Sequence, residues 1–319
     1  MSSMQAFTVH NFSFVTLKFN GFYDLEEWRP FLFIPYFLMF LLSTISNSVL
    51  LYLIISKKAL HSPMCILIGL MSVVDLFLPI FFVPNMLLSF LFKWNGISLL
   101  GCLVQMFFIH CIGTFQSTLL AWMAVDRFFA ICRPLYYHKF MQMPNFLKYI
   151  IVPVFRNVIL IVTIVSLAGR LSFCGTNEMD HCFCEHMAVV QLACGDISIN
   201  NIVGLVTVFL VPTVDFLFFS LSYFVILASV LQSGKSHLKA INTCITHIIV
   251  MAVTLTFALM AFLSYRIRNN LSSSARVFLS TMYLLFPSCF NPIIYGVRTK
   301  EIREQFLKFI KQIKILPHH

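Results

Sequence analysis

Residues 99–132 have the sequence LLGCLVQMFFIHCIGTFQSTLLAWMAVDRFFAIC, in which Asp126 and Arg127 are the only Asp, Glu, Lys or Arg side chains. A helix needs ~20 apolar residues to cross the ~30 Å hydrocarbon core of a bilayer. Seven stretches reach that length, and they are Phe31–Ile55, Met64–Leu91, Leu99–Cys132, Tyr149–Ala168, Ile202–Leu231, Cys244–Leu263 and Ala275–Tyr295. Because these stretches are continuously apolar rather than alternating, they predict membrane-spanning helices and not the strands of a barrel.

The composition also points to a polytopic membrane protein. Of the 319 residues, 59% are hydrophobic and 11% are charged, whereas soluble domains are roughly 45–50% apolar and about 25% charged. The chain has eleven Gly, twelve Pro and no low-complexity tract, which excludes a collagen-like or disordered chain. We therefore expect an all-α membrane protein, a seven-helix transmembrane bundle.

The segment after the last apolar stretch predicts a short helix on the membrane surface. Lys300–Ile315 places Ile302, Phe306, Phe309, Ile310 and Ile313 at helical spacing, with Arg303, Lys308, Lys311 and Lys314 among them. This pattern is typical of an amphipathic helix that lies on a leaflet. The expected organisation is thus an N-terminal segment at 1–30, the seven-helix domain at 31–297, and the amphipathic helix and tail at 298–319.

Lys and Arg are distributed unequally between the two sides of this topology. If the C-terminal tail is cytoplasmic, fourteen of the twenty-two lie in inner segments, seven in outer segments, and Arg156 within a helix. The positive-inside rule then predicts a cytoplasmic C-terminus and, after seven crossings, an extracellular N-terminus at the plasma membrane. The glycosylation sequon Asn11-Phe12-Ser13 agrees with this orientation. The net charge of +10 therefore reflects topology rather than nucleic-acid binding.

Polar side chains inside the bilayer are costly and are candidates for function. Asp75 lies midway along the second stretch and Asn47 in the second half of the first. Asn291-Pro292 interrupts the seventh, where proline permits a kink. These groups at similar depth predict either a wet cluster holding a cation such as sodium at Asp75 and Asn47, or hydrogen bonds that hold the helices together. Arg156 and Asp215 are further charges within the helices, and the sequence does not identify their partners.

The third stretch carries polar groups towards both of its ends. Asp126-Arg127 stands at the inner end, and an arginine there can pair with its neighbour in one state and reach other acceptors in another. The alternative is an arginine that extends to the headgroups. His110 precedes Arg127 by 17 residues, or ~25 Å along a helix. One helix would therefore reach both sides of the membrane.

Five short motifs resemble those of a known family. They are LHSPM at Leu60–Met64, MAVDRFFAIC at Met123–Cys132, Ser222-Tyr223, KAINTC at Lys239–Cys244, and Pro287 with NPIIY at Asn291–Tyr295. Together they resemble the olfactory receptors, within the rhodopsin-like G-protein-coupled receptors, and the resemblance covers nearly the whole chain. The outer-loop stretches Cys184–Val190 and Leu192–Cys194 further resemble the class I ("fish-like") branch.

The chain also departs from this family pattern. Phe128 stands where tyrosine usually follows the Asp-Arg pair, Cys65 where tyrosine usually follows Pro-Met, and Ser46 where glycine usually precedes Asn47. Gln116 replaces a common glutamate, which weakens the cation site suggested by Asp75. Thr254-Leu255 replaces a Phe-Tyr pair, which argues against an aromatic switch there. We expect the agonist response to differ from that of typical members.

The resemblance implies that a small odorant from outside binds the bundle and that a heterotrimeric G protein of the olfactory Gs type responds inside. The pocket is expected between the third, fifth and sixth helices. His110 and Arg266 are the main ligand-binding candidates, because the corresponding positions line the pocket in class I receptors for carboxylic acids, which Arg266 could clamp in a bidentate pair. Weaker pocket candidates, chosen by helical facing, are Met106, Gly113, Thr114, Thr207 and Phe262. Residues implied in activation and coupling are Asp126, Arg127, Tyr223, Asn291, Pro292 and Tyr295.

Each main ligand candidate has a simpler interpretation. Arg266 can be a loop cation that faces water, and His110 can form a hydrogen bond between helices. The sequence leaves both alternatives open. A carboxylic acid or another polar odorant is the expected ligand class.

Five cysteines fall on the predicted outer side, where an oxidising compartment favours disulfides. The resemblance implies the pairs Cys102–Cys184 and Cys174–Cys194, which leaves Cys182 unpaired; spacing alone also permits Cys102–Cys182. His181, Cys184, Glu185 and His186 are suitable ligand types for zinc or copper, but bridged cysteines no longer act as thiolates. We therefore expect no metal site and no cofactor.

Other classes of membrane protein fit less well. A transporter or channel should have internal repeats or broken helix pairs, and an enzyme should have a convergent catalytic set; the helices contain neither. The main rival is a non-olfactory receptor of the same fold for another small ligand. An amine receptor is disfavoured because no aspartate stands one turn above His110. The expected partners are the odorant, the G protein and membrane lipids, without nucleic acid.

Overall fold

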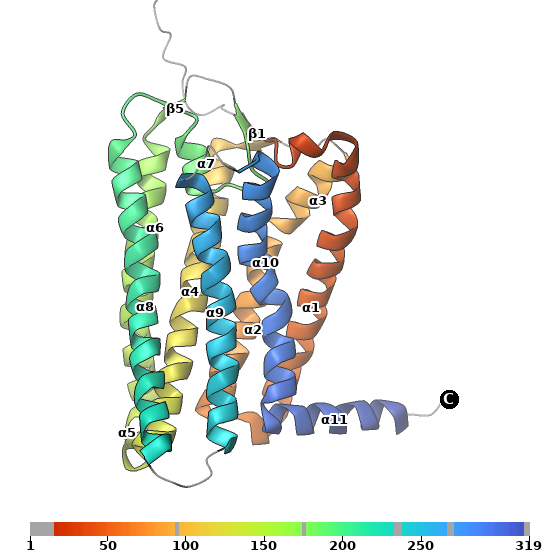
Figure 1. Ribbon diagram of the computed structural model, residues 1–319. Helices are drawn as coiled ribbons and strands as arrows, with labels where there is room; N and C mark the ends of the chain where they lie inside the picture. The colour runs from red at the N-terminus through yellow and green to blue at the C-terminus, as the bar shows by residue number, and fades with distance from the viewer. Residues whose placement is uncertain (1–15, 93–95, 174–176, 233–237, 267–270, 316–319) are drawn as a thin grey trace, which may run out of the picture.

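The protein is a bundle of long helices that lie side by side (Figure 1). The computed structural model describes residues 16–92, 96–173, 177–232, 238–266 and 271–315. The bundle contains α1 (Phe33–Ser56), α2 (Pro63–Ile80) with α3 (Val83–Leu91), α4 (Leu99–Cys132), α6 (Met143–Gly169), α8 (Ser198–Gln232), α9 (Leu238–Arg266) and α10 (Ser273–Arg298). Six of these segments are long and apolar enough to cross a membrane, and α9 has a shorter apolar part, Ile248–Ser264. The predicted seven-helix fold is confirmed.

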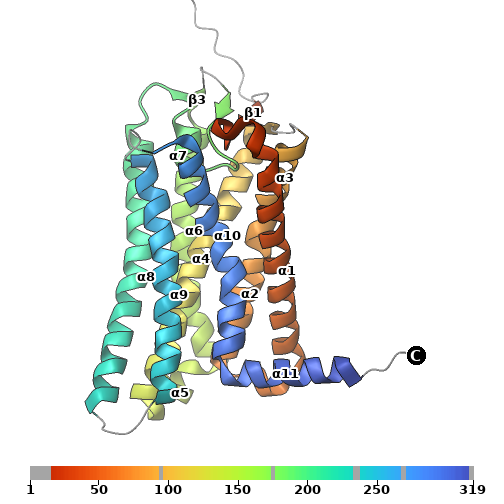
Figure 2. The same cartoon turned by 45° about the vertical axis from the view of Figure 1, so that its right-hand side comes forward.

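Short elements close the two ends of the bundle. One end carries β1 (Thr16–Phe19), β2 (Gly96–Ser98), β3 (Ser172–Phe173), β4 (Glu178–Met179), β5 (Ala193–Cys194), α7 (His186–Val190) and a 3₁₀ helix at Tyr23–Leu32. The other end carries a 3₁₀ turn at Lys58–Leu60, α5 (Pro134–Met141) and α11 (Lys300–Ile315). We call these the sheet end and the α11 end; Figures 1 and 2 show α11 running sideways from the foot of α10 past α1 and out of the bundle.

Several helix starts follow from local sequence. Ser62, Ser98 and Ser272 each accept a hydrogen bond from the backbone N–H three residues later, at 3.3, 3.1 and 3.2 Å. A serine at this position satisfies one of the donors that a helix start leaves unpaired. Pro63 follows Ser62 at the first helical position, where its missing N–H is not needed. α2, α4 and α10 therefore begin where these serines stand.

The second apolar stretch is divided, unlike the single helix predicted over Met64–Leu91. α2 ends at Ile80 and α3 begins at Val83, with Phe81 and Phe82 donating to Leu78 and Pro79 through three-residue turns. Pro79 and Pro84 each lack a backbone N–H, so the regular four-residue ladder cannot run through this region unbroken. Pro287 and Pro292 have a milder effect, since α10 continues through both to Arg298.

A small three-stranded sheet covers the sheet end. β1 pairs antiparallel with β2, with Thr16 opposite Ser98, and parallel with β4, with Phe19 opposite Met179. Leu17 and Phe19 of β1 are buried, because alternate residues of a strand face the same side. The N-terminal strand thus packs onto the bundle together with the loop that follows α6.

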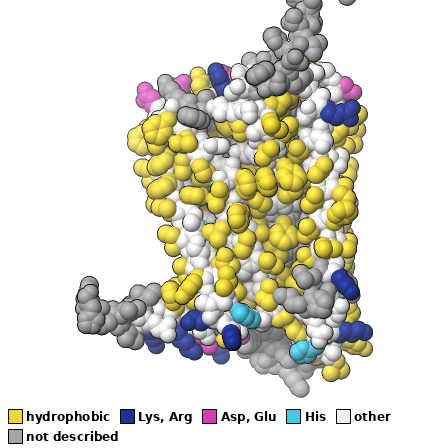
Figure 3. All heavy atoms as spheres, turned by 180° about the vertical axis from the view of Figure 1, so that it is seen from behind, with side chains coloured by type: hydrophobic (Ala, Val, Ile, Leu, Met, Phe, Trp, Pro, Cys, Tyr) yellow, Lys and Arg dark blue, Asp and Glu magenta, His cyan; other side chains and the backbone are white. Residues whose placement is uncertain are grey.

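The surface is that expected of a chain in a bilayer. In Figure 3 hydrophobic side chains cover the middle of the bundle, and the charged side chains that are visible gather at its two ends. Large apolar residues such as Phe155, Phe218 and Phe224 are 59–73% exposed on the long helices. Such extensive exposed apolar surface is rare in soluble monomers. The chain is therefore a multi-pass membrane protein.

Candidate functional site

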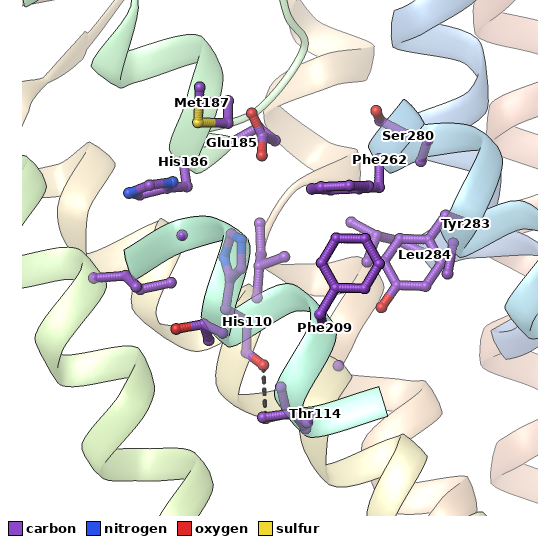
Figure 4. A pocket seen from close by; sticks show the side chains of 18 of the residues that line it. His110, Thr114, Glu185, His186, Met187, Phe209, Phe262, Ser280, Tyr283 and Leu284 are labelled. Atoms are coloured by element: carbon purple, nitrogen blue, oxygen red, sulfur yellow. Dashed lines mark hydrogen bonds between the residues drawn. The ribbon is translucent and has the colours of Figure 1, made fainter. Parts of the chain in front are cut away.

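A cavity of about 390 Å³ lies within the bundle near the sheet end (Figure 4). α4, α6, α8, α9 and α10 supply its walls, and the segment Phe183–Met187, which leads into α7, covers it. Most of the lining is apolar; its polar members are His110, Thr114, Glu185, His186, Thr207, Thr213, Ser280 and Tyr283. An apolar cavity with a few converging polar groups is the usual form of a small-molecule site.

The structure brings most of the predicted pocket residues to this cavity. His110, Gly113, Thr114, Thr207 and Phe262 line it. Met106 is fully buried and is not among the lining residues. Arg266 is the last residue of α9, and its side chain lies outside the described residues.

The ring of His110 is oriented by its own helix. Its Nδ1 lies 2.9 Å from the carbonyl oxygen of Met106, and because a carbonyl only accepts, Nδ1 carries the hydrogen. In the neutral ring Nε2 is then a hydrogen-bond acceptor. One turn below, Thr114 Oγ1 donates to the carbonyl of His110 at 2.9 Å (Figure 4). The imidazole is therefore held at the cavity wall in a defined tautomer.

Five polar lining residues were not predicted as pocket residues, and they are Glu185, His186, Thr213, Ser280 and Tyr283. Glu185 accepts from the backbone N–H of Ala188 at 2.8 Å and so caps α7, and in Figure 4 it lies above the cavity between His186 and Phe262. His186 packs against Gly204 of α8, where an added Cβ would lie 2.8 Å from the imidazole Cε1. The sequence offered Glu185 and His186 only as metal-ligand types. Ser280 and Tyr283, three residues apart on α10, could have been found by helical spacing.

A disulfide anchors the loop above the cavity. Cys102 of α4 is bonded to Cys184, with their Cα atoms 5.4 Å apart, as the resemblance implied. Cys182 is a free, buried thiol in this structure. Cys194 is also disulfide-bonded, while Cys174, its expected partner, lies outside the described residues. Gln105 of α4 also anchors this loop, because its Oε1 accepts a hydrogen bond from the backbone N–H of Cys184 at 2.8 Å.

The residues considered as metal ligands have other roles. Cys184 is in the disulfide, and burial raises the pKa of the Cys182 thiol to about 12, which keeps it protonated at neutral pH. Within the described ranges, no three or more His, Cys, Asp and Glu side chains are grouped so that they could hold a metal ion.

His181 lies completely buried in the same loop. Its Nδ1 accepts from the backbone N–H of Phe183 at 3.2 Å. Burial lowers the pKa of His181 to about 3, and the positive charge of Arg276 lowers it as well. The folded loop therefore holds this imidazole in its neutral form, in which Nδ1 can accept.

We expect the packing of this loop to weaken as the pH falls below about 6.5. Once the loop opens, His181 regains an ordinary pKa near 6.5, so the opened form binds more protons and stability is lost with falling pH. The loss should reach about 2 kcal/mol by pH 5. The melting temperature of the purified protein at pH 7.5 and 5 should fall further for the wild type than for His181→Gln. Equal pH dependence in the two proteins would contradict this.

Asp75 is the centre of a polar cluster between α2, α4 and α10. Gln116 donates to its carboxylate, and so do Ser288 at 3.4 Å and Asn291 at 3.3 Å. Asn47 joins the cluster from α1, because its Nδ2 donates to the carbonyl of Ser288 at 2.8 Å. The described contacts of the Asp75 carboxylate thus come from side-chain amides and a hydroxyl on α4 and α10. Ser43 of α1 donates to the backbone carbonyl of Asp75, and Asn47 is linked to Asp75 through Ser43 and Ser288.

The two unassigned charges of the sequence pair with each other. Arg156 of α6 lies 3.1 Å from Asp215 of α8, and Ser117 of α4 donates to the same carboxylate at 2.6 Å. Asn157 adds a bond from α6 to Thr118 of α4 at 3.0 Å. Asp215 is 4% exposed. This network ties three helices together directly below the cavity, where Thr114 belongs both to the lining and to the network.

At the α11 end, Arg127 pairs with Asp126 at 3.0 Å. Tyr137 of α5 donates to the other oxygen of Asp126 at 2.9 Å, and burial raises the pKa of Tyr137, which keeps that proton in place. Tyr223 and Tyr295 are buried in the hydrophobic cluster at this end, and Pro292 is buried within α10. Asp126 therefore has a partner on both sides, and Arg127 keeps a quarter of its side chain exposed.

Comparison with known proteins gives a consistent result. The model of the olfactory receptor family matches residues 36–313. Human olfactory receptor 52K1 is 38% identical over 294 residues, which cover 92% of this chain and 94% of the relative. Human olfactory receptor 52K2 is 36% identical over 309 residues (96% and 98%), and human olfactory receptor 51E2 is 35% identical over 303 residues (94% and 95%). These similarities extend over the whole bundle and fit the class I branch.

Proposed function

Because the chain belongs to the olfactory receptor family, we propose that it binds a small extracellular odorant in the cavity beneath α7 and activates a heterotrimeric G protein. Family membership makes it an odorant-sensing G-protein-coupled receptor and not an enzyme. We include in this proposal the class of the ligand, the residues that hold the ligand, the Gs type of the G protein and the orientation of the chain in the membrane.

The observation that carries the proposal is the cavity itself. Its volume of about 390 Å³ suits a small molecule, and its aromatic wall contains Phe209 and Phe262, whose ring centroids lie 5.2 Å apart. An apolar chain of a ligand would occupy this wall. A polar group of the same ligand would lie near His110, where Nε2 can accept a hydrogen bond.

We propose a carboxylic acid or another polar odorant as the ligand, with Arg266 as the cation for an acid. Glu185 contributes a carboxylate to the lining, and it would repel an acidic ligand unless a cation lay between the two. A guanidinium can pair with a carboxylate through two parallel hydrogen bonds. Arg266, at the sheet end of α9, is the residue to which we give this role.

A cAMP reporter assay in cells expressing the full chain tests this. Carboxylic acids, amines, alcohols and amino acids are compared as ligands. For an acid that activates the wild type, we expect Arg266→Ala to raise the half-maximal concentration about tenfold or more, since a hydrogen bond to a charged group contributes roughly 1.5–3 kcal/mol. For an alcohol that activates the wild type, whose hydroxyl can donate to Nε2, His110→Phe should raise the half-maximal concentration.

Lys18→Ala is the matched control, because Lys18 is another sheet-end cation and does not line the cavity. It should respond as the wild type does. Equal responses of Arg266→Ala and the wild type would rule out the clamp. Activation by amines alone would instead assign the polar contact to Glu185.

For signalling we propose a shift between two arrangements of the bundle. A ligand that binds the active arrangement more tightly than the resting one shifts the population towards the active arrangement. The size of this shift is limited by the difference between its affinities for the two arrangements. α9 would move away from Arg127 at the α11 end and open a cleft for the G protein, with Tyr223 and Tyr295 stabilising the open form. The Asp126–Arg127 pair and the Tyr137 contact support Arg127 as the group held in the resting form. Loss of the cAMP response in cells that lack the stimulatory α-subunit would support the Gs type.

We propose that the sheet end is extracellular and the α11 end cytoplasmic. The excess of Lys and Arg in the segments at the α11 end supports this orientation. Epitope tags at the two termini test it: in intact cells only the N-terminal tag should bind antibody. Labelling of both tags before permeabilisation would overturn the topology.

A further inference from the structure

A second hollow lies on the outside of the bundle, between α4 and α6 at the sheet end. It has a volume of about 520 Å³ and is formed by Leu100–Phe108 on one side and Val162–Arg170 on the other. Eight residues along α4 correspond to about 12 Å of helix. The hollow is therefore a groove that runs down from the sheet end into the level of the bilayer.

The groove opens towards lipid and not towards the odorant cavity. Leu100, Val104 and Val162 are 73, 47 and 46% exposed on the side of the bundle away from its core. Phe108 stacks on Phe81 with ring centroids 4.7 Å apart and planes 8° from parallel. Apart from Ser166, Gly169 and Arg170, the side chains that line the groove are large and apolar, so an occupant presents apolar atoms to them and comes from the membrane.

Small residues keep the groove open on the α6 side. Ser166 and Gly169 line it, and a Cβ added at Gly169 would lie 3.1 Å from Leu103 Cδ1 of α4. The two helices thus approach closely at the upper end of the groove without filling it. A large side chain at either position would occupy the space that a ligand needs.

A single cation stands at the rim. Arg170 follows α6 directly, is exposed and belongs to the groove lining. Among the described residues it forms no ion pair, whereas Arg127, Arg156 and Arg276 each pair with an aspartate. At a membrane-spanning helix end, such an arginine lies at the level of the lipid headgroups.

We propose that this groove binds one phospholipid of the adjacent leaflet, with an acyl chain along α4 and α6 and the phosphate paired with Arg170. Guanidinium and phosphate match in charge and in bidentate geometry, whereas the single hydroxyl of a sterol would leave the charge unpaired. With the orientation proposed above, the lipid belongs to the outer leaflet. The proposal does not depend on odorant binding.

The test uses the full-length receptor in phosphatidylcholine nanodiscs with a phosphatidylcholine probe that carries a photoactivatable acyl chain. We expect saturable labelling of peptides from Leu100–Phe108 and Val162–Arg170. Arg170→Gln should lower this labelling up to about fivefold, which is the upper end of what one exposed ion pair contributes. Ser166→Trp should abolish it by filling the groove.

Two matched variants serve as controls. Lys18→Gln removes another sheet-end cation, and Thr163→Trp places the same ring on an exposed position of α6 outside the groove lining. Both should label like the wild type. If Ser166→Trp does not fold, Arg170→Gln still decides the question.

Three results would overturn the proposal. Labelling spread evenly over all lipid-facing helices would indicate ordinary lipid contact, and unchanged labelling in Arg170→Gln would remove the role of the cation. Displacement of the phospholipid probe by a sterol would assign the groove to a sterol.

Discussion

Asp215→Asn is expected to lower the amount of receptor at the cell surface about tenfold or more. Asp215 is 4% exposed and lies 3.1 Å from Arg156 inside the bundle. Removing one member of a buried ion pair leaves the other charge uncompensated and costs about 3–5 kcal/mol. The loss would be measured by flow cytometry of an N-terminal tag and by the melting temperature of the purified receptor.

The double variant Asp215→Asn/Arg156→Gln provides the control for this prediction. Because it removes both charges, it should express better than Asp215→Asn alone, since side chains in one network are not energetically independent. Ser220→Ala, a polar change on α8 outside the described contacts of the pair, should behave as the wild type does. If the two losses simply add in the double variant, Arg156 and Asp215 do not stabilise each other.

Cys102→Ser and Cys184→Ser should each reduce surface expression as strongly as Asp215→Asn does. The receptor that still reaches the surface should not respond to ligand. The bond joins cysteines 82 residues apart, and closing a loop of that length contributes about 4.5 kcal/mol in the chain-entropy description. Phe183 and Glu185 on either side of Cys184 line the cavity, so a released loop also removes part of the binding site. Surface labelling and the cAMP reporter measure the two effects.

Cys182→Ala is the matched variant, because Cys182 is equally buried but carries a free thiol. It should keep a near-wild-type surface level and response. The opposite pattern, with loss in Cys182→Ala and none in Cys184→Ser, would mean that Cys102 pairs with Cys182 in cells.

Most helix positions could be predicted from local patterns in the sequence. α4 occupies Leu99–Cys132 and α11 occupies Lys300–Ile315, as predicted. Length and apolarity suffice here, because a segment that leaves water for lipid must satisfy its own backbone hydrogen bonds and does so as a helix. The break between α2 and α3 was not predicted, because hydropathy does not show where two prolines interrupt the backbone hydrogen bonds of a helix.

The lining of the cavity was predicted in part. His110, Gly113, Thr114, Thr207 and Phe262 came from helical facing and family resemblance, and all five line it. Met106 lies one turn from His110 yet packs into the core, because facing on one helix does not say which neighbour fills the space. Ser280 and Tyr283 complete the wall from α10, 170 and 173 residues after His110.

Hydropathy and short motifs were enough to establish a membrane bundle and its family, because each depends on residues close together in the chain. Pairings across the bundle required the packed helices. Arg156 meets Asp215 59 positions away, and Glu185 and His186 were brought to the cavity by a loop tied to Cys102. Such contacts depend on how side chains of different helices fill a common space, and no local pattern encodes that arrangement.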